Sequence, residues 1–79
     1  MSFDLINLWN KILEYIKQEI GEQAFENWFT QTMLASVTDD SIVIQVPSNF
    51  FKDWIYDHYR DILNIAILKT LGKVVPVRF

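Results

Sequence analysis

The chain contains no cysteine, and among its 79 residues it has only two glycines, two prolines and one histidine. Without cysteine it can form neither disulfides nor a thiolate metal site, and this composition fits a reducing compartment. No apolar run approaches the roughly 20 residues that a membrane helix needs. The opening MSFD lacks the basic region of a secretory signal. We therefore expect a cytoplasmic location and no membrane contact.

The few glycines and the single histidine also argue against catalysis. Gly21 and Gly72 stand at expected helix ends, so the chain has no phosphate-cradling loop and no dinucleotide fingerprint. No Ser/His/Asp or Cys/His set can be assembled around His58, which we interpret as a packed residue. Asp53, Asp57 and Asp61, spaced four apart, could hold a metal, but a solvated helix face tied by Asp57–Arg60 contacts explains them better. We expect no catalytic, metal or cofactor site.

Positive charge is scarce and unevenly placed. The formal net charge is −3; residues 1–40 hold two lysines against seven acids, and residues 41–79 hold five bases against three acids. No basic stripe typical of a strong DNA-binding domain is present. A weak single-stranded nucleic-acid-binding module remains the alternative function, and it would use exposed aromatics with these bases: Lys52, Arg60, Lys69, Lys73 and Arg78.

Apolar residues, by contrast, are plentiful, at 51% of the chain. Residues 4–20 have helical apolar spacing, and Gly21 is placed to end that helix. Their apolar arc covers about 180°, whereas one core contact needs only about 100°. Either this helix meets something outside its own domain, or two elements of the same domain flank it. Residues 22–30 predict a short second helix with Phe25, Trp28 and Phe29 on one face, as core.

The apolar period then changes from helical to two. MLASV and SIVIQV, joined by Thr38–Ser41, predict a β-hairpin with Ile42, Ile44 and Val46 on one face, and the aspartates of the joint favour a turn. A third helix runs from Ser48 or Asn49 to about Leu71 and ends at Gly72. The tail KVVPVRF predicts an edge strand, because Pro76 cannot donate to a ladder. The sequence thus predicts one domain over residues 1–79, a two-layer α+β fold of order α-α-β-β-α-β with helices packed on a three-stranded sheet.

The third helix begins with two neighbouring phenylalanines, which cannot point the same way. Phe50 shares its direction with a polar stripe of Asp53, Asp57, Arg60, Asp61 and Asn64, and Leu68 lies there too. The opposite, apolar arc is formed by these residues: Phe51, Trp54, Ile55, Tyr59, Ile62, Ile65 and Ala66. Phe51 and Trp54 are therefore expected in the core. Phe50 is expected at the surface, where a partner could meet it.

Four motifs, in this order and spacing, resemble one known family. They are LW at Leu8–Trp9, FENW at Phe25–Trp28, PSNFFKDW at Pro47–Trp54 and the closing LGKVVPVRF. Together they are similar to the N-terminal domain of DnaA, the bacterial replication initiator, over essentially the whole chain. The layer order looks related to a KH module as well. The chain has no G-x-x-G, however, so RNA clamping of the KH type is disfavoured.

The resemblance implies a non-catalytic adaptor at the replication origin, the N-terminal part of a larger initiator. It implies a weak homodimer, docking of the replicative helicase and of initiation regulators, and at most weak contact with single-stranded DNA. Leu5, Trp9 and Ile12 would then serve self-association. Ser48, Asn49, Phe50 and Asp53 would dock partners, and Phe50 with Lys52 would touch single-stranded DNA.

The resemblance also sets limits. ATP and magnesium are implied only for the full-length initiator, outside this domain. Ser48 replaces the family's usual Asn, which puts a contact by that amide in doubt. Ala24 stands where some members carry an acid that touches the helicase, so that contact is not carried over to this chain.

Overall fold

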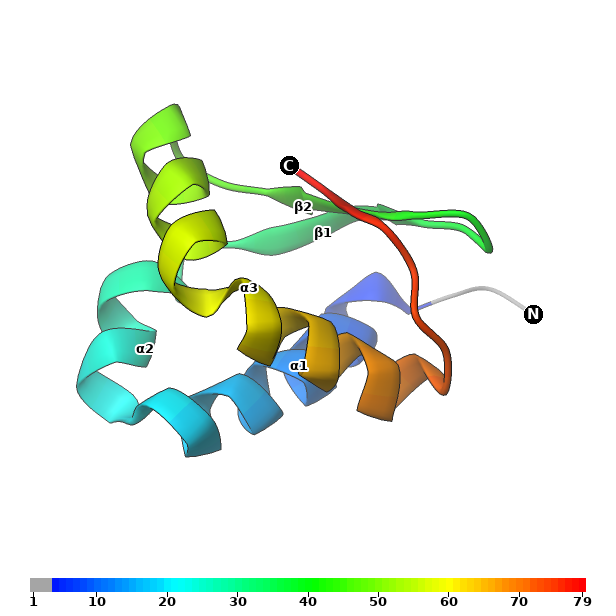
Figure 1. Ribbon diagram of the computed structural model, residues 1–79, viewed down its shortest axis with the longest axis horizontal. Helices are drawn as coiled ribbons and strands as arrows, with labels where there is room; N and C mark the ends of the chain where they lie inside the picture. Colours follow the sequence, from blue (N-terminus) through cyan, green and yellow to red (C-terminus); the bar gives the residue numbers. More distant parts are fainter. Residues whose placement is uncertain (1–3) are drawn as a thin grey trace.

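The computed structural model describes residues 4–79 and consists of helices packed on a small sheet (Figure 1). The elements follow the expected order: α1 (Leu5–Ile20), α2 (Glu22–Trp28), β1 (Met33–Val37), β2 (Ile42–Gln45), α3 (Asn49–Leu71) and β3 (Val77–Arg78). The α+β class and the α-α-β-β-α-β order are thereby confirmed. No helix of the described residues is long and apolar enough to cross a membrane.

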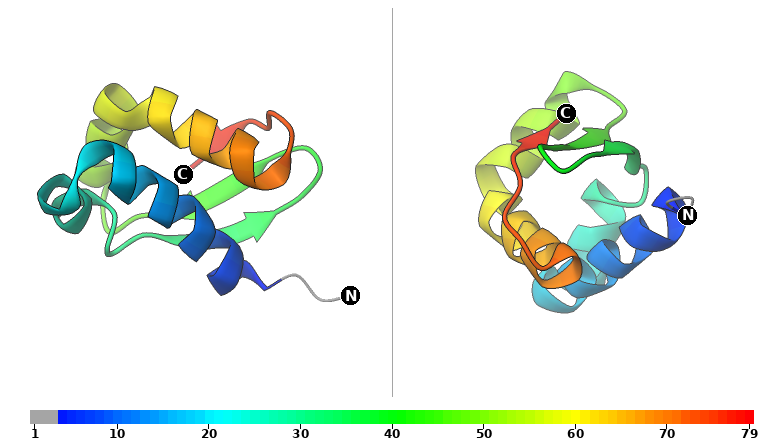
Figure 2. Two further views of the ribbon diagram at one scale, coloured as in Figure 1. Left: turned by 90° about the horizontal axis from the view of Figure 1, so that it is seen from below. Right: turned by 90° about the vertical axis from the view of Figure 1, so that its right-hand side faces the viewer.

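The sheet has the order β1-β2-β3, with β1 antiparallel to β2 and β3 parallel to it. The tail therefore forms an edge strand, as predicted from Pro76. Leu34, Ile42 and Ile44 are buried beneath the helices, whereas Met33 and Gln45, which face each other across the hairpin, are exposed. Two views at right angles place the helices on one side of the sheet (Figure 2).

Strand β1 contains a bulge that the sequence pattern does not reveal. Leu34 lies opposite Ile44 and Val37 opposite Ile42, so three steps along β1 match two steps along β2. The extra residue turns Val37 towards the core, where strict alternation from Leu34 would have placed it on the open face. Ala35 is exposed at this irregularity.

Identifiable groups set the helix ends. The Asp4 carboxylate accepts a hydrogen bond from the Asn7 backbone N–H at 3.1 Å, which caps α1. Gly21 and Gly72 end α1 and α3 with positive φ angles of 89° and 78°, as expected. Ser48 occupies the N-cap position of α3, but its hydroxyl makes no capping bond.

The hairpin turn is held by Thr38 and not by the aspartates. Its hydroxyl oxygen accepts hydrogen bonds from the backbone N–H groups of Asp40 and Ser41, at 3.2 and 3.0 Å. The Asp39 carboxylate instead reaches the Lys73 ammonium group at 3.2 Å. The turn falls where the sequence predicts it, while the side chain that stabilises it differs.

The core lies between the sheet and the helices, and α1, α3 and both hairpin strands contribute to it. Its largest fully buried side chains are Phe29, Ile12, Ile16, Ile42, Ile44, Ile55 and Ile67. The prediction that Phe51 and Trp54 lie in the core is wrong. Phe51 and Trp54 are only half-buried and lie outside the core cluster, because α2, and not the sheet, faces this part of the helix.

Candidate partner-docking site

Five aromatic rings gather where α2 meets the first half of α3, and we call them the aromatic surface: Trp28, Phe50, Phe51, Trp54 and His58. Only Trp28 comes from α2. Its ring lies 5.7 Å from the Phe50 centroid, 5.3 Å from that of Phe51 and 4.6 Å from that of Trp54. One residue of α2 thus contacts three rings of α3, and the fourth, His58, stacks on Trp54.

Trp54 is the central ring of a stack. It lies parallel to Trp28, at 8°, and nearly parallel to His58, with 4.1 Å between the Trp54 and His58 centroids. The His58 Nδ1 atom is 3.1 Å from the Trp54 carbonyl oxygen, which fixes the imidazole ring. His58 is exposed rather than packed in the core, but one face of its ring stacks on Trp54. The Trp28, Trp54 and His58 rings therefore hold one another in place beside Phe50 and Phe51.

Phe50 lies at the outer edge of this stack and is 63% exposed. Its ring contacts Trp28 and Trp54 on one side and leaves the other side open to solvent. The prediction that Phe50 points to the surface is confirmed. The prediction that Phe51 points into the core is corrected, since Phe51 packs its ring against Trp28 within the aromatic surface.

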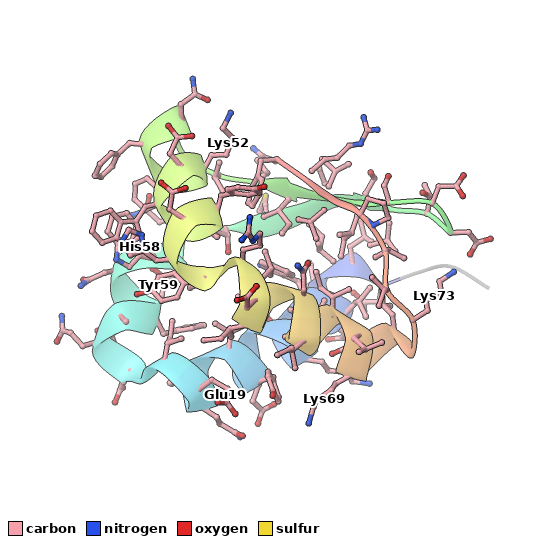
Figure 3. All side chains as sticks on the ribbon, in the orientation of Figure 1. Glu19, Lys52, His58, Tyr59, Lys69 and Lys73 are labelled. Atoms are coloured by element: carbon pink, nitrogen blue, oxygen red, sulfur yellow. The ribbon has the colours of Figure 1, made fainter. Side chains whose placement is uncertain are left out.

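The other residues predicted to dock partners surround Phe50 at the start of α3. Ser48, Asn49 and Asp53 are all exposed, and Lys52 is half-buried. Figure 3 shows Lys52 near the start of α3 and His58 further along, on the side towards α2. A role of Phe50 and Lys52 in contacting single-stranded DNA stays a prediction.

The acidic stripe of α3 remains a solvated face. Asp53, Asp57 and Asp61 are exposed, and no three potential ligand side chains within residues 4–79 come together as a metal site. The expected Asp57–Arg60 contact is replaced by a long Arg60–Asp61 pair at 3.9 Å. Arg60 also lies over the Tyr56 ring, and its pKa is raised chiefly by Tyr56 and then by Asp61.

The residues predicted for self-association are not exposed, as a contact surface would require. Trp9 is 4% exposed, Ile12 is fully buried and Leu5 is half-buried. The Trp9 indole N–H donates to the carbonyl and hydroxyl oxygens of Thr32, both at 3.2 Å. Trp9 and Ile12 are therefore core residues, because α1 is flanked by α2, α3 and β1 of its own domain.

An apolar surface nevertheless remains on the outer side of α1. Here α1 and β1 enclose a hollow of about 340 Å³ lined by Leu5, Ile6, Trp9, Leu13 and Met33, among others. Ile6 is 75% exposed at its edge, and Met33 is exposed as well. Ile6 belongs to the apolar arc of α1 that is wider than one core contact needs. The part of this arc that stays exposed includes Ile6 but not Trp9.

Residues 7–68 match the family model described as DnaA N-terminal domain, and the chain belongs to that family. Among curated relatives, the chromosomal replication initiator protein DnaA of Flavobacterium psychrophilum is 42% identical over 67 residues, 85% of this chain. The protein of the same name from Thermodesulfovibrio yellowstonii is 36% identical over 76 residues, 96% of this chain.

The chain spans 14% of the length of the first relative and 17% of the second. The similarity therefore identifies an N-terminal domain of replication initiator proteins. It covers none of the remaining parts of those proteins.

Proposed function

We propose that this domain is a non-catalytic adaptor of a replication initiator. Partner proteins dock on the aromatic surface around Phe50, and copies of the domain self-associate weakly through the outer side of α1. The partners we propose are the replicative helicase and regulators of initiation, in the cytoplasm. No cofactor is needed for this role, and ATP and magnesium would serve other parts of the full-length initiator.

The observation that carries the proposal is the exposure of Phe50 on a fixed base of stacked rings. Aromatic side chains dominate binding energy at protein interfaces when they fill a partner's pocket. A ring already held by Trp28 and Trp54 loses little conformational freedom on binding, which favours affinity. The exposed polar groups of Asn49 and Asp53 can supply the hydrogen-bonding rim of such an interface.

The test is Phe50→Ala, measured by calorimetric titration against the replicative helicase of the same organism. We expect the dissociation constant to rise at least about tenfold, as for a central aromatic contact. The free energy of unfolding should change by less than about 1 kcal/mol, since most of the ring is already in water. Helicase binding that is unchanged in Phe50→Ala would contradict the proposal.

Leu68→Ala is the matched control. Leu68 is also an exposed apolar residue of α3, 40% in solvent, but it lies several turns beyond the aromatic surface. Its truncation should leave both helicase binding and stability close to those of the unaltered chain. Equal losses in the two variants would point to a general effect of apolar surface on α3 rather than to docking at Phe50.

A further inference from the structure

A groove separates α3 from the segment that follows it, away from the aromatic surface. Its volume is about 350 Å³, and its walls are formed by these side chains: Tyr56, Arg60, Asn64, Val74, Val77 and Phe79. Leu63 and Val75 form an apolar floor, and both are buried. The right-hand view of Figure 2 shows the C-terminal segment between β2 and α3.

The backbone of β3 presents a free edge to this groove. The Ile42 N–H donates to the Pro76 carbonyl oxygen at 2.9 Å, which directs that carbonyl towards β2. In a trans peptide the carbonyl and the N–H point in opposite directions, so the Val77 N–H points away from β2. The alternation of a strand directs the Val77 carbonyl to the same outer side. Pro76 has no backbone N–H, but at this position the N–H would have pointed towards β2. The edge of β3 that faces away from β2 therefore loses no donor.

The other edge of the sheet is less suitable for an added strand. β1 is interrupted by the bulge at Ala35, which breaks the regular spacing of its hydrogen-bonding groups. An edge of this kind is protected against pairing with other chains. The β3 edge has no such interruption within its two residues and lies beside an apolar hollow.

The lining of the groove defines what it can hold. Arg60 carries the only charged side chain among the residues that line it. The guanidinium group is positioned over the Tyr56 ring, 5.0 Å from its centroid. From Tyr56 to Asn64, α3 rises about 12 Å, which matches three to four residues of extended chain.

We propose that an extended peptide segment of a partner protein adds to β3 as a fourth strand in this groove. Its backbone pairs with the N–H and carbonyl of Val77, its alternate aliphatic side chains cover the apolar floor, and a carboxylate meets Arg60. Strand addition at a sheet edge gives affinity through the main chain and specificity through alternate side chains. This surface is separate from the one around Phe50, so the inference goes beyond the proposed function.

The test is a titration of ¹⁵N-labelled chain with acetyl-Val-Thr-Val-Thr-Glu-amide and with the peptide of reversed order, since either strand direction can pair. We expect chemical-shift changes over residues 56–64 and 74–79 and none at Trp28 or Phe50. Replacing the peptide's Glu by Gln should weaken binding up to about fivefold, as for an exposed ion pair. Arg60→Gln should have the same effect, and Arg78→Gln, outside the groove, should have none.

Backbone methylation separates strand pairing from apolar contact. Successive N–H groups of an extended chain point to opposite sides, so only every second one can reach β3. Of two peptides N-methylated at the third or the fourth residue, one should lose binding and the other should keep it. Val77→Pro, which removes the outward N–H, should weaken binding about threefold to tenfold.

Three results would overturn the proposal. One is the absence of groove shifts at millimolar peptide. Another is equal binding of both methylated peptides, which would show that the peptide backbone is not engaged. The third is movement of the groove signals on dilution of the chain alone, which would make a second copy the occupant.

Discussion

At the scale of single residues, Trp9 was expected to serve self-association but is a core residue. The indole ring is almost fully enclosed, and its N–H is satisfied by two oxygens of Thr32. A buried tryptophan N–H usually finds a hydrogen-bond partner, because a buried donor without one costs free energy. Thr32 is a buried polar residue, and it supplies the acceptors that the Trp9 N–H needs.

Trp9→Ala should lower the free energy of unfolding by about 3–5 kcal/mol, through the cavity it leaves. Trp9→Phe should cost about 1–3 kcal/mol, because the apolar contact largely survives while the Thr32 oxygens lose their donor. Urea unfolding followed by circular dichroism measures both. Ile6→Ala, three residues earlier and mostly exposed, should stay within about 0.5 kcal/mol of the unaltered chain. Unaltered stability of Trp9→Ala would show that its ring is not part of the core.

Residue directions were predictable from the sequence only where the covering element was also known. The helical wheel places Phe50 outwards, and the structure agrees. Trp54 and Ile65 lie only about 40° and 60° from Phe50 on this wheel, at the edge of the apolar arc, and Phe51 lies about 100° away. None of these three side chains is buried. A helical wheel gives the direction of a side chain, but it does not show how much of that side chain a neighbouring element covers. The short helix α2 reaches the start of α3 with a single large ring, Trp28, so rings cluster there without being enclosed.

At the scale of elements, two glycines end the long helices in different backbone conformations. Gly72 has φ 78° and ψ 8°, the left-handed conformation of a helix C-terminus. Gly21 has φ 89° and ψ 161°, a region essentially restricted to glycine. A Cβ atom added at either position would meet nothing within 4 Å, so any cost of substitution comes from the backbone alone.

Gly72→Ala should lower the unfolding free energy by about 1 kcal/mol and Gly21→Ala by about 1–3 kcal/mol. Thermal and urea unfolding of the two variants give the comparison. Gly72→Asn should recover part of the loss, because asparagine tolerates the left-handed conformation, whereas Gly21→Asn should not. A larger loss at Gly72 than at Gly21 would contradict the difference in backbone strain.

The elements themselves were largely readable because their signals are local. Glycines at helix ends, the change of apolar period and the alternation of KVVPVRF each depend on a few neighbouring residues. The bulge at Ala35 and the parallel pairing of β3 were not readable, since both depend on the partner strand. The same holds for Thr38, which stabilises a turn that the sequence ascribes to aspartate.

At the scale of the whole molecule, the surplus apolar surface lies on the outer side of α1, and it bears on self-association. Ile6→Asp places a charge at the edge of this hollow and should raise the dimer dissociation constant at least about tenfold, because an unpaired carboxylate is costly to bury. Sedimentation over a concentration series measures the change. Val74→Asp is the control, since Val74 is equally exposed, at 77%, but lies at the β3 groove.

A mass that does not vary with concentration would remove the self-association proposal. Loss of the dimer in Val74→Asp alone would move the interface to the β3 groove and would leave α1 without a partner. Retention of the dimer in Val74→Asp and its loss in Ile6→Asp would place the contact between the outer sides of two α1 helices.

The three tryptophans divide between the core and the surface, and the molecule thereby carries its own optical labels. Trp9 is enclosed and hydrogen-bonded, whereas the parallel indoles of Trp28 and Trp54 lie 4.6 Å apart at the aromatic surface. Two such rings couple their electronic transitions, so their circular dichroism reports on the stack itself. The emission of Trp9 reports on the fold once Trp28 and Trp54 are replaced by phenylalanine. A ligand that separates Trp28 from Trp54 would change the circular dichroism of the unaltered chain, without any dye attached.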